Sequence, residues 1–289
     1  MRHRLGKLAS QMGALAATAI LGGLLSATLV RNSPGFDADE RLLDARLDAA
    51  SREAIRAEHA ANHDVLRFYV RQIAGILRGD FGVSPSLNRP ISELIASRMP
   101  VTLRLMGIGV AAAWGAALAL AGMAAMWRGA AFSRITSAAS TCTLCLPSAV
   151  VALLVFSLGG PMGVVIPLVL FPRLFETVRN LLDNAYSRPH ILTARAKGVS
   201  PAGILLRHAL PVCAPELLAL AGVSAIMAFG AAIPVETLCD VPGLGQLAWK
   251  AATARDLPLL VTLTLLIAIA TQVMNAVADW LTPFTEQAA

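Results

Sequence analysis

Charged residues are scarce in this chain of 289 residues, of which only 15% are charged and 56% are hydrophobic. The mean hydropathy of +0.65 is too high for a soluble protein, because a soluble core must be enclosed by a polar surface. The composition therefore excludes an ordinary soluble fold and predicts an all-α integral membrane protein.

Catalytic motifs are missing as well. The chain has no Gly-x-x-x-x-Gly-Lys-Ser/Thr sequence, the loop that cradles nucleotide phosphates, so we do not expect it to bind or hydrolyse ATP itself. Residues 198–203 have the wrong spacing for a serine-nucleophile elbow, and Ser200 is better explained as a helix cap. We therefore predict a non-catalytic chain that binds no cofactor of its own.

Metal ligands and redox pairs are equally few. Cys142 and Cys145 form a Cys-x-x-Cys inside an apolar run, where small buried thiols are the simpler interpretation. His59 and His63, four residues apart on an expected helix, would share one face, but two imidazoles make an incomplete site. No metal site is predicted.

Long runs without Asp, Glu, Lys or Arg are abundant. A spanning helix needs roughly 20 apolar residues. Residues 8–30, 105–127, 217–235 and 257–278 each supply one span, and the longer run 135–172 supplies two, separated by a turn at Gly159-Gly160-Pro161. The sequence therefore predicts six spans, the first an uncleaved anchor because it is longer than the core of a signal peptide.

The short loops give the orientation of these spans. If the N-terminus is inside, the segments that lie inside are rich in basic residues. The segment between spans four and five has a single acid, Asp183. The basic residues of these inner segments are Arg2, Arg4, Lys7, Arg128, Arg134, Arg179, Arg188, Arg195, Lys197 and Arg207. Positive charge favours the cytoplasmic side, so both termini are predicted to be cytoplasmic. The same distribution argues against nucleic acid as a partner.

Three regions follow from this pattern. Residues 1–30 form the cytoplasmic start and the first span, and residues 31–99 form an extracytoplasmic helical cap. In that cap Ser51 begins one expected helix, and apolar residues repeat at helical spacing over 65–77. Residues 100–289 form a transmembrane core of five spans.

Two features inside the spans leave alternatives open. Span two stacks Gly107, Ala111, Gly115 and Ala119 at intervals of four, a face that either packs within this chain or forms a seam against a second membrane subunit.

Span four carries Arg173 and Glu176. Ionisable residues inside a span are functional candidates, so these two either anchor the helix near its inner end or line a translocation path. Glu236, just after span five, is a third path candidate.

The loop between spans four and five, residues 184–211, is the most informative stretch. Pro189 suits the first turn of a short helix, and Gly198 suits its left-handed C-terminal cap. Ser200 and Pro201 suit the start of a second short helix. The expected result is a protruding elbow, suited to pressing on a partner protein.

The same loop carries a resemblance. Thr193-Ala-Arg-Ala-Lys-Gly198, followed by Leu206-Arg-His-Ala-Leu-Pro211, closely resembles the signature of permeases from dipeptide, oligopeptide and nickel ABC importers. Further matches are Leu77-Arg-Gly-Asp-Phe-Gly82, Arg89-Pro-Ile, Glu236-Thr, Pro242-Gly-Leu-Gly245 and Arg255-Asp-Leu-Pro258. These motifs cover nearly the whole chain in order. The chain departs from the family at Asn184, where members usually have an acid, and at Val241, where they have an aromatic residue.

The resemblance implies a fold of the type I ABC importer kind and a complex in the bacterial inner membrane. Its partners would be a second homologous permease, two ATPase subunits that bind the ATP, and an extracytoplasmic substrate-binding protein. The elbow would be the coupling element, with these residues at or beside the ATPase: Ala185, Thr193, Ala194, Arg195, Ala196, Lys197 and Gly198.

Two other classes of function compete with this interpretation. A secondary carrier or channel driven by an ion gradient predicts an internal repeat or paired carboxylates at the membrane midplane, and neither is visible. A non-transporting scaffold predicts no ATP-dependent uptake at all. The sequence does not name the substrate.

Overall fold

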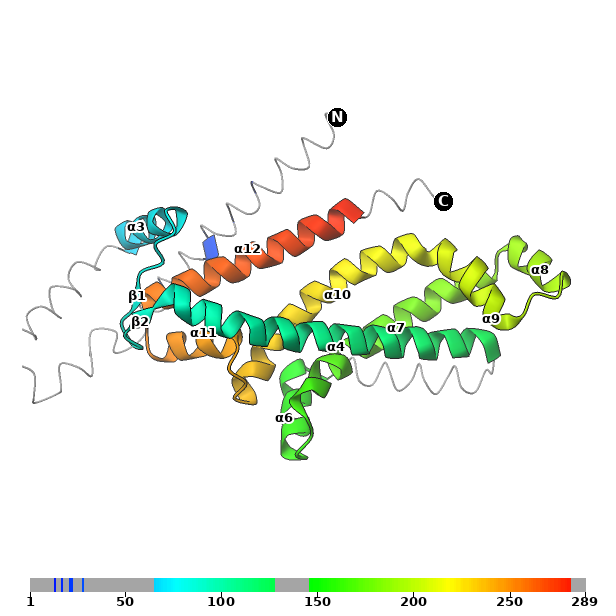
Figure 1. The fold of residues 1–289 in the computed structure, drawn as a ribbon, viewed down its shortest axis with the longest axis horizontal. Helices are drawn as coiled ribbons and strands as arrows, with labels where there is room; N and C mark the ends of the chain where they lie inside the picture. The colour runs from blue at the N-terminus through cyan, green and yellow to red at the C-terminus, as the bar shows by residue number, and fades with distance from the viewer. Residues whose placement is uncertain are drawn as a thin grey trace, which may run out of the picture. The chain divides into compact units, whose positions relative to one another are not determined.

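The computed structural model describes residues 65–127 and 146–281, together with the isolated helical positions 13, 17, 21, 22 and 28. The described residues are mostly helical, as predicted (Figure 1). In chain order the helices are α3 (Val65–Leu77), α4 (Ile91–Trp127), α6 (Ser148–Ser157), α7 (Val165–Tyr186), α8 (Pro189–Ala196), α9 (Pro201–Ile204), α10 (Leu210–Leu238), α11 (Leu244–Thr253) and α12 (Leu257–Leu281). Shorter elements are the strands β1 (Val83–Ser84) and β2 (Arg89–Pro90), the 3₁₀ turn η2 (Met162–Val164) and the π turn η3 (Leu205–Ala209).

The chain divides into two units, Met1–Met99 with Gln246–Gln272 and Pro100–Gly245 with Val273–Ala289. In the first unit α3, predicted from its apolar spacing, packs against the beginning of α12. Tyr69 is buried there against Val261 and Leu265, and burial raises the pKa of the Tyr69 phenol. The Gln72 amide donates to Thr262 Oγ1 at 3.0 Å, which joins the two helices by a polar contact as well.

A hairpin in the same unit is held by one buried carboxylate. Strands β1 and β2 are antiparallel, with Val83 opposite Pro90. Asp256 accepts hydrogen bonds from the Ser84 hydroxyl and from Ser86, whose Oγ lies 2.6 Å away. Its other oxygen accepts from the Leu259 backbone N–H at 3.1 Å, an N-terminal cap for α12. Asp256 therefore fixes the hairpin and the start of α12 together.

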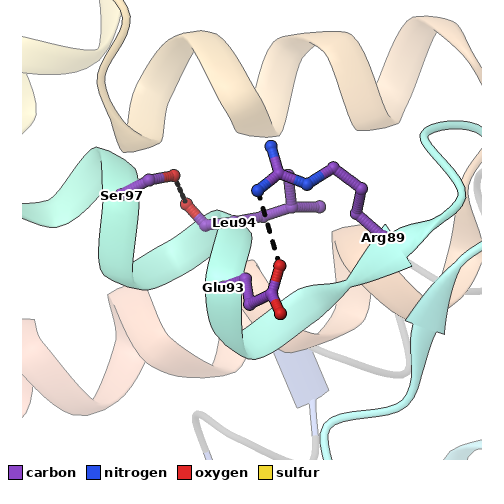
Figure 2. A network of polar contacts seen from close by, with 4 residues as sticks. All are labelled: Arg89, Glu93, Leu94 and Ser97. Carbon is purple, nitrogen blue, oxygen red and sulfur yellow. Dashed lines mark hydrogen bonds and ion pairs between the residues drawn. The ribbon is translucent and has the colours of Figure 1, made fainter.

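Helix α4 begins directly after this hairpin, at Ile91, whereas the predicted span begins at residue 105. Figure 2 shows Arg89 of β2 reaching toward Glu93 in the first turn of α4, with 3.4 Å between nitrogen and oxygen. Both side chains are exposed, so the ion pair contributes little to stability, although an acid near a helix N-terminus is favourable. The Ser97 hydroxyl donates to the Leu94 carbonyl at 2.9 Å in the next turn.

The second unit contains the main apolar core. Helix α10 packs against α7 and α6, and the buried residues of α7 include Leu170, Leu174 and Val178. Helix α4 contributes a stripe of small buried residues at every fourth position, namely Ala113, Ala117, Ala121 and Ala125.

This buried stripe is not the one suggested by the sequence. Gly107, Ala111, Gly115 and Ala119 are all exposed in the described part of the chain. Packing within the second unit therefore uses the neighbouring alanine stripe, and the predicted face stays open.

The described part of the third predicted span becomes helical only at Ser148. Helix α6 begins at Ser148 and has only 10 residues, because Pro147 adopts an extended conformation (φ −59°, ψ 143°) and Leu146 lies outside any helix. Proline lacks a backbone donor and disfavours the α conformation in the residue before it. A continuous helix through 135–158 is therefore wrong. The turn after it is confirmed, with Gly159 at φ +67° between α6 and α7.

Among the described residues three helices are long and apolar enough to cross a membrane: Ile91–Met126, Pro201–Leu238 and Leu257–Val277. They match the predicted spans two, five and six, of which spans two and six end one residue further on. Helix α7, the predicted span four, has 22 residues, while most of residues 8–30 lie outside the described part. Cys142, Cys145, His59, His63 and the helix expected after Ser51 lie outside it too.

Candidate functional site

Helix α8 forms the first half of the elbow, which we define as residues 184–211. It begins as predicted, with Pro189 in its first turn after Arg188 in an extended conformation. One face is fixed to the core by Ile191, which is 0% exposed, and by Ala194. Ala185 and Tyr186 at the end of α7 belong to the same buried cluster. Figure 1 shows α8 and α9 together at one end of α7.

The end of α8 is a glycine cap. Gly198 has φ +76°, and its N–H donates to the Arg195 carbonyl at 2.9 Å. The next N–H, from Val199, donates to the Ala194 carbonyl at 3.2 Å. This pair of hydrogen bonds is the Schellman motif, which satisfies the last carbonyls of a helix and turns the chain sharply. The cap predicted at Gly198 is confirmed.

The second half of the elbow begins as predicted but continues differently. Ser200 caps α9 by accepting a hydrogen bond from the Gly203 N–H at 3.2 Å, with Pro201 in the first turn. The expected second short helix is wrong, because α9 continues through the π turn η3 into α10 as one helix, Pro201–Leu238.

Pro211 lies inside this continuous helix. A proline inside a helix lacks the donor and presses its ring against the carbonyl four residues earlier. The π turn directly before it, closed by the Leu210 N–H donating to the Leu205 carbonyl, widens the helix there. The elbow is therefore one short helix braced against the start of a long one.

The outer surface of the elbow combines positive charge with two apolar side chains. Thr193, Arg195, Ala196, Lys197 and Gly198 are exposed, whereas Ala185 and Ala194 are buried. The Arg195 guanidinium lies 5.8 Å from the centre of the Tyr186 ring, a cation–π contact that restrains it.

Leu192 and Leu206 are the residues that the sequence interpretation missed. Each is 63% exposed, Leu192 on α8 and Leu206 in the π turn. A leucine left in water loses about 1.5–3 kcal/mol that burial would supply. Their neighbours Ile191 and Leu205 face inward. Once Pro189 is taken as the start of α8, the helical periodicity shows which side chains point outward, and this signal could have found Leu192.

The path candidates on α7 lie in a different environment. Arg173 is exposed and follows Pro172, which interrupts the backbone hydrogen bonds of α7. Glu176 is half-buried. Nearer the elbow, Arg179 pairs with Asp183 at 3.7 Å.

Glu236 is enclosed by the loop that follows α10. Its side chain is 0% exposed, and Oε2 accepts a hydrogen bond from the Gly245 N–H at 2.6 Å. The same loop is fixed to α4, since the Leu244 N–H donates to Thr102 Oγ1 at 2.9 Å. A Cβ on Gly243 would overlap Cδ of Glu236, so only glycine fits there. The loop therefore closes around the carboxylate.

No group of three or more potential metal ligands is found in the described ranges 65–127 and 146–281. The second unit thus contains a cationic elbow packed against the core and a loop after α10 that encloses Glu236. Helix α7 carries the ionisable residues Arg173 and Glu176.

Comparison with known proteins assigns this arrangement to a family. Residues 117–288 match the family described as "Binding-protein-dependent transport system inner membrane component". The chain belongs to this family and is a multi-pass protein of the inner membrane, which confirms the resemblance found in the sequence.

Relatives cover most of the chain. The "Oligopeptide transport system permease protein AppB" of Bacillus subtilis (strain 168) is 25% identical over 285 residues, 89% of this chain and 90% of that protein. The "Glutathione transport system permease protein GsiC" of Salmonella paratyphi A (strain ATCC 9150 / SARB42) is 30% identical over 229 residues, 72% of this chain and 74% of that protein. Family and relatives together identify the chain as the permease subunit of an ATP-driven importer.

Proposed function

We propose that this permease moves peptides or peptide-like solutes and that its elbow transmits the state of the ATPase subunits to the spans. The observation that carries the proposal is the construction of the elbow, in which a buried face fixes α8 to α7 and the opposite face is left exposed. A force applied to α8 would reach α7 through Ile191 and α10 through the continuous helix from Pro201.

The partner surface follows from the exposed side chains. Arg195 and Lys197 suit an acidic rim, and Leu192 suits an apolar pocket in each ATPase subunit. The chain itself contributes no catalytic group and no cofactor; ATP belongs to the ATPase subunits. The full assembly in this proposal has a second permease, two ATPase subunits and an extracytoplasmic binding protein.

The topology in this proposal has six spans with both termini in the cytoplasm, and the regions keep the bounds 1–30, 31–99 and 100–289. The open face of Gly107, Ala111, Gly115 and Ala119 is directed toward the second permease. Arg173 and Glu176 are candidates for the path between the permeases. Glu236, enclosed by its loop, acts on the path by positioning that loop.

The mechanism is alternating access. ATP binding closes the ATPase pair, the elbows move with it, and the spans open toward the loaded binding protein. Hydrolysis and release of the products then return the spans to the inward state.

The test uses vesicles that contain the whole complex. Labelled peptide should accumulate only when ATP is present on the elbow side and loaded binding protein on the other side. Uptake driven by a proton or sodium gradient without ATP would instead support a secondary carrier, and uptake under neither condition would support a scaffold.

A further inference from the structure

A pocket of about 340 Å³ opens along the stretch of α4 from Pro100 to Ile108, within the second unit. Its lining is apolar apart from a single charged residue, Arg104. The other lining residues come from α4, from the 3₁₀ turn η2 and from the loop after α10, and they include Val101, Leu105, Ile108 and Val241. The volume falls in the range of small-ligand sites, which are mostly apolar with a few polar groups that orient the ligand.

Arg104 is an exposed cation that nothing in the described part of the chain neutralises. Within residues 65–127 and 146–281 its guanidinium makes no ion pair and no hydrogen bond. No carboxylate lines the pocket. An arginine in this setting favours a planar anion, since its fork of donors matches both oxygens of a carboxylate.

The side of α4 that continues from Arg104 toward the C-terminus of the helix indicates what can occupy the pocket. Arg104, Ile108, Ala111 and Gly115 follow one another at spacings of three or four and therefore share one side of the helix. Between Ile108 and Leu118 this side carries only small, exposed residues. Small residues on a membrane helix serve close approach by other protein rather than contact with lipid chains.

A helix packed closely over the Arg104 end of this face would bury the charge of Arg104 without a partner, which is strongly unfavourable. This end of the face is better suited to an anionic solute that is held in water-accessible space. In the proposed topology this end of α4 lies on the extracytoplasmic side, where the binding protein delivers its cargo.

We propose that the pocket is a subsite for the transported solute, in which Arg104 holds a carboxylate and the apolar walls take the group beside it. The inference rests on the proposed function, because it places the part of α4 around Arg104 on the path of the solute. It assigns the solute to the class of carboxylates that carry an apolar substituent.

The test measures occupancy of the pocket directly. Ile108 is 60% exposed and lines the pocket, so Ile108→Cys, placed in a chain whose four native cysteines are replaced by alanine, reports access to N-ethylmaleimide, a neutral reagent. The chain is studied in the assembled complex. Hexanoate and hexanamide serve as probes, because they differ only in the charge of the head group.

The expected result is that about 10 mM hexanoate slows the labelling of the Ile108→Cys variant about fivefold, as a dissociation constant in the low millimolar range requires. Hexanamide should have no effect. Protection should disappear with Arg104→Gln and persist in part with Arg104→Lys. Equal protection by both probes, equal protection in Arg104→Gln, or no protection by hexanoate would each overturn the proposal.

A transport measurement separates this inference from the proposed function. Vesicles with the wild-type complex are supplied with trialanine and with its C-terminal amide, and the ratio of the two uptake rates should fall toward one in Arg104→Gln. If ATP drives uptake of both forms equally in the wild type, the subsite is wrong and the importer stands. If ATP drives uptake of neither form while hexanoate protects the introduced thiol, the subsite stands and the peptide assignment is wrong.

Discussion

Two glycines in this permease are required for opposite reasons. At Gly243 the obstacle to a side chain is space, because a Cβ would overlap the carboxylate atoms of Glu236. At Gly198 there is nothing within 4 Å of such a Cβ, but the backbone has φ +76°. The two sites therefore predict different responses to substitution.

Gly243→Ala should destabilise the protein by about 1 to 3 kcal/mol, the usual cost of overpacking a filled site. The measurement is the thermal unfolding midpoint of the purified complex. Glu236→Ala removes the obstructing carboxylate, so the cost of Gly243→Ala should be smaller in that background. Additive losses of stability in the double variant would show that the loop does not close around Glu236 as described.

Gly198→Val should leave membrane insertion intact and abolish most uptake. A β-branched residue in the left-handed conformation costs on the order of 1 to 2 kcal/mol, and relief of that strain would open the Schellman turn. Gly198→Asn is the matched control, because asparagine tolerates this conformation, and it should retain most activity. Equal ATP-dependent uptake by all three proteins at equal expression would show that the turn is not needed for coupling.

At the scale of the element, two neighbouring residues of α8 differ in their role: one packs into the core and the other faces outward. Ile191 is 0% exposed and Leu192 is 63% exposed. Ile191→Ala should cost about 2 to 5 kcal/mol and lower the yield of folded permease. Leu192→Ala should leave the yield unchanged, since substitutions of exposed residues usually change stability by less than about 0.5 kcal/mol.

The functional readout for Leu192→Ala is copurification of the ATPase subunits, which should decrease together with stimulation of ATP hydrolysis by loaded binding protein. Arg195→Glu should act in the same direction by reversing a charge at the proposed rim. Full retention of the ATPases by both variants would contradict the assignment of this face of α8.

The elements that follow local rules were predictable from the sequence. The cap at Gly198 and the start of α9 at Ser200 each depend on a few adjacent residues, and both are confirmed. The elements that depend on longer-range packing were not. The sequence predicted a second short helix after Ser200, but the π turn joins α9 to α10, and the charge-free run gave no sign that α6 begins only after Pro147.

The sequence also did not show which side chains are exposed and which are buried. Which small residues of α4 are buried depends on where α7 and α10 pack, so the stripe beginning at Ala113 was missed in favour of the one beginning at Gly107. Arg104 escaped notice for the same reason, because nothing in its sequence neighbours shows that it lines a pocket. The enclosure of Glu236 also required the three-dimensional path of the loop.

For the whole molecule, topology is the most general prediction. Reporter fusions after residues 31, 128, 160, 187, 245 and 285 should report out, in, out, in, out and in. The fusions after Gly160 and Ser187 are the most informative, because they lie on either side of α7, and Gly160 comes just after the short helix α6. If these two fusions report the same side of the membrane, α7 does not span and the six-span assignment fails.

The central claim is that the elbow contacts the ATPase, and site-specific photocrosslinking tests it most directly. A benzophenone amino acid is placed at Leu192, and as a control at Leu158, which is 83% exposed in the turn between α6 and α7. The account predicts a covalent adduct between the permease and an ATPase subunit from position 192 and none from position 158. An adduct from position 158 with none from position 192 would contradict it.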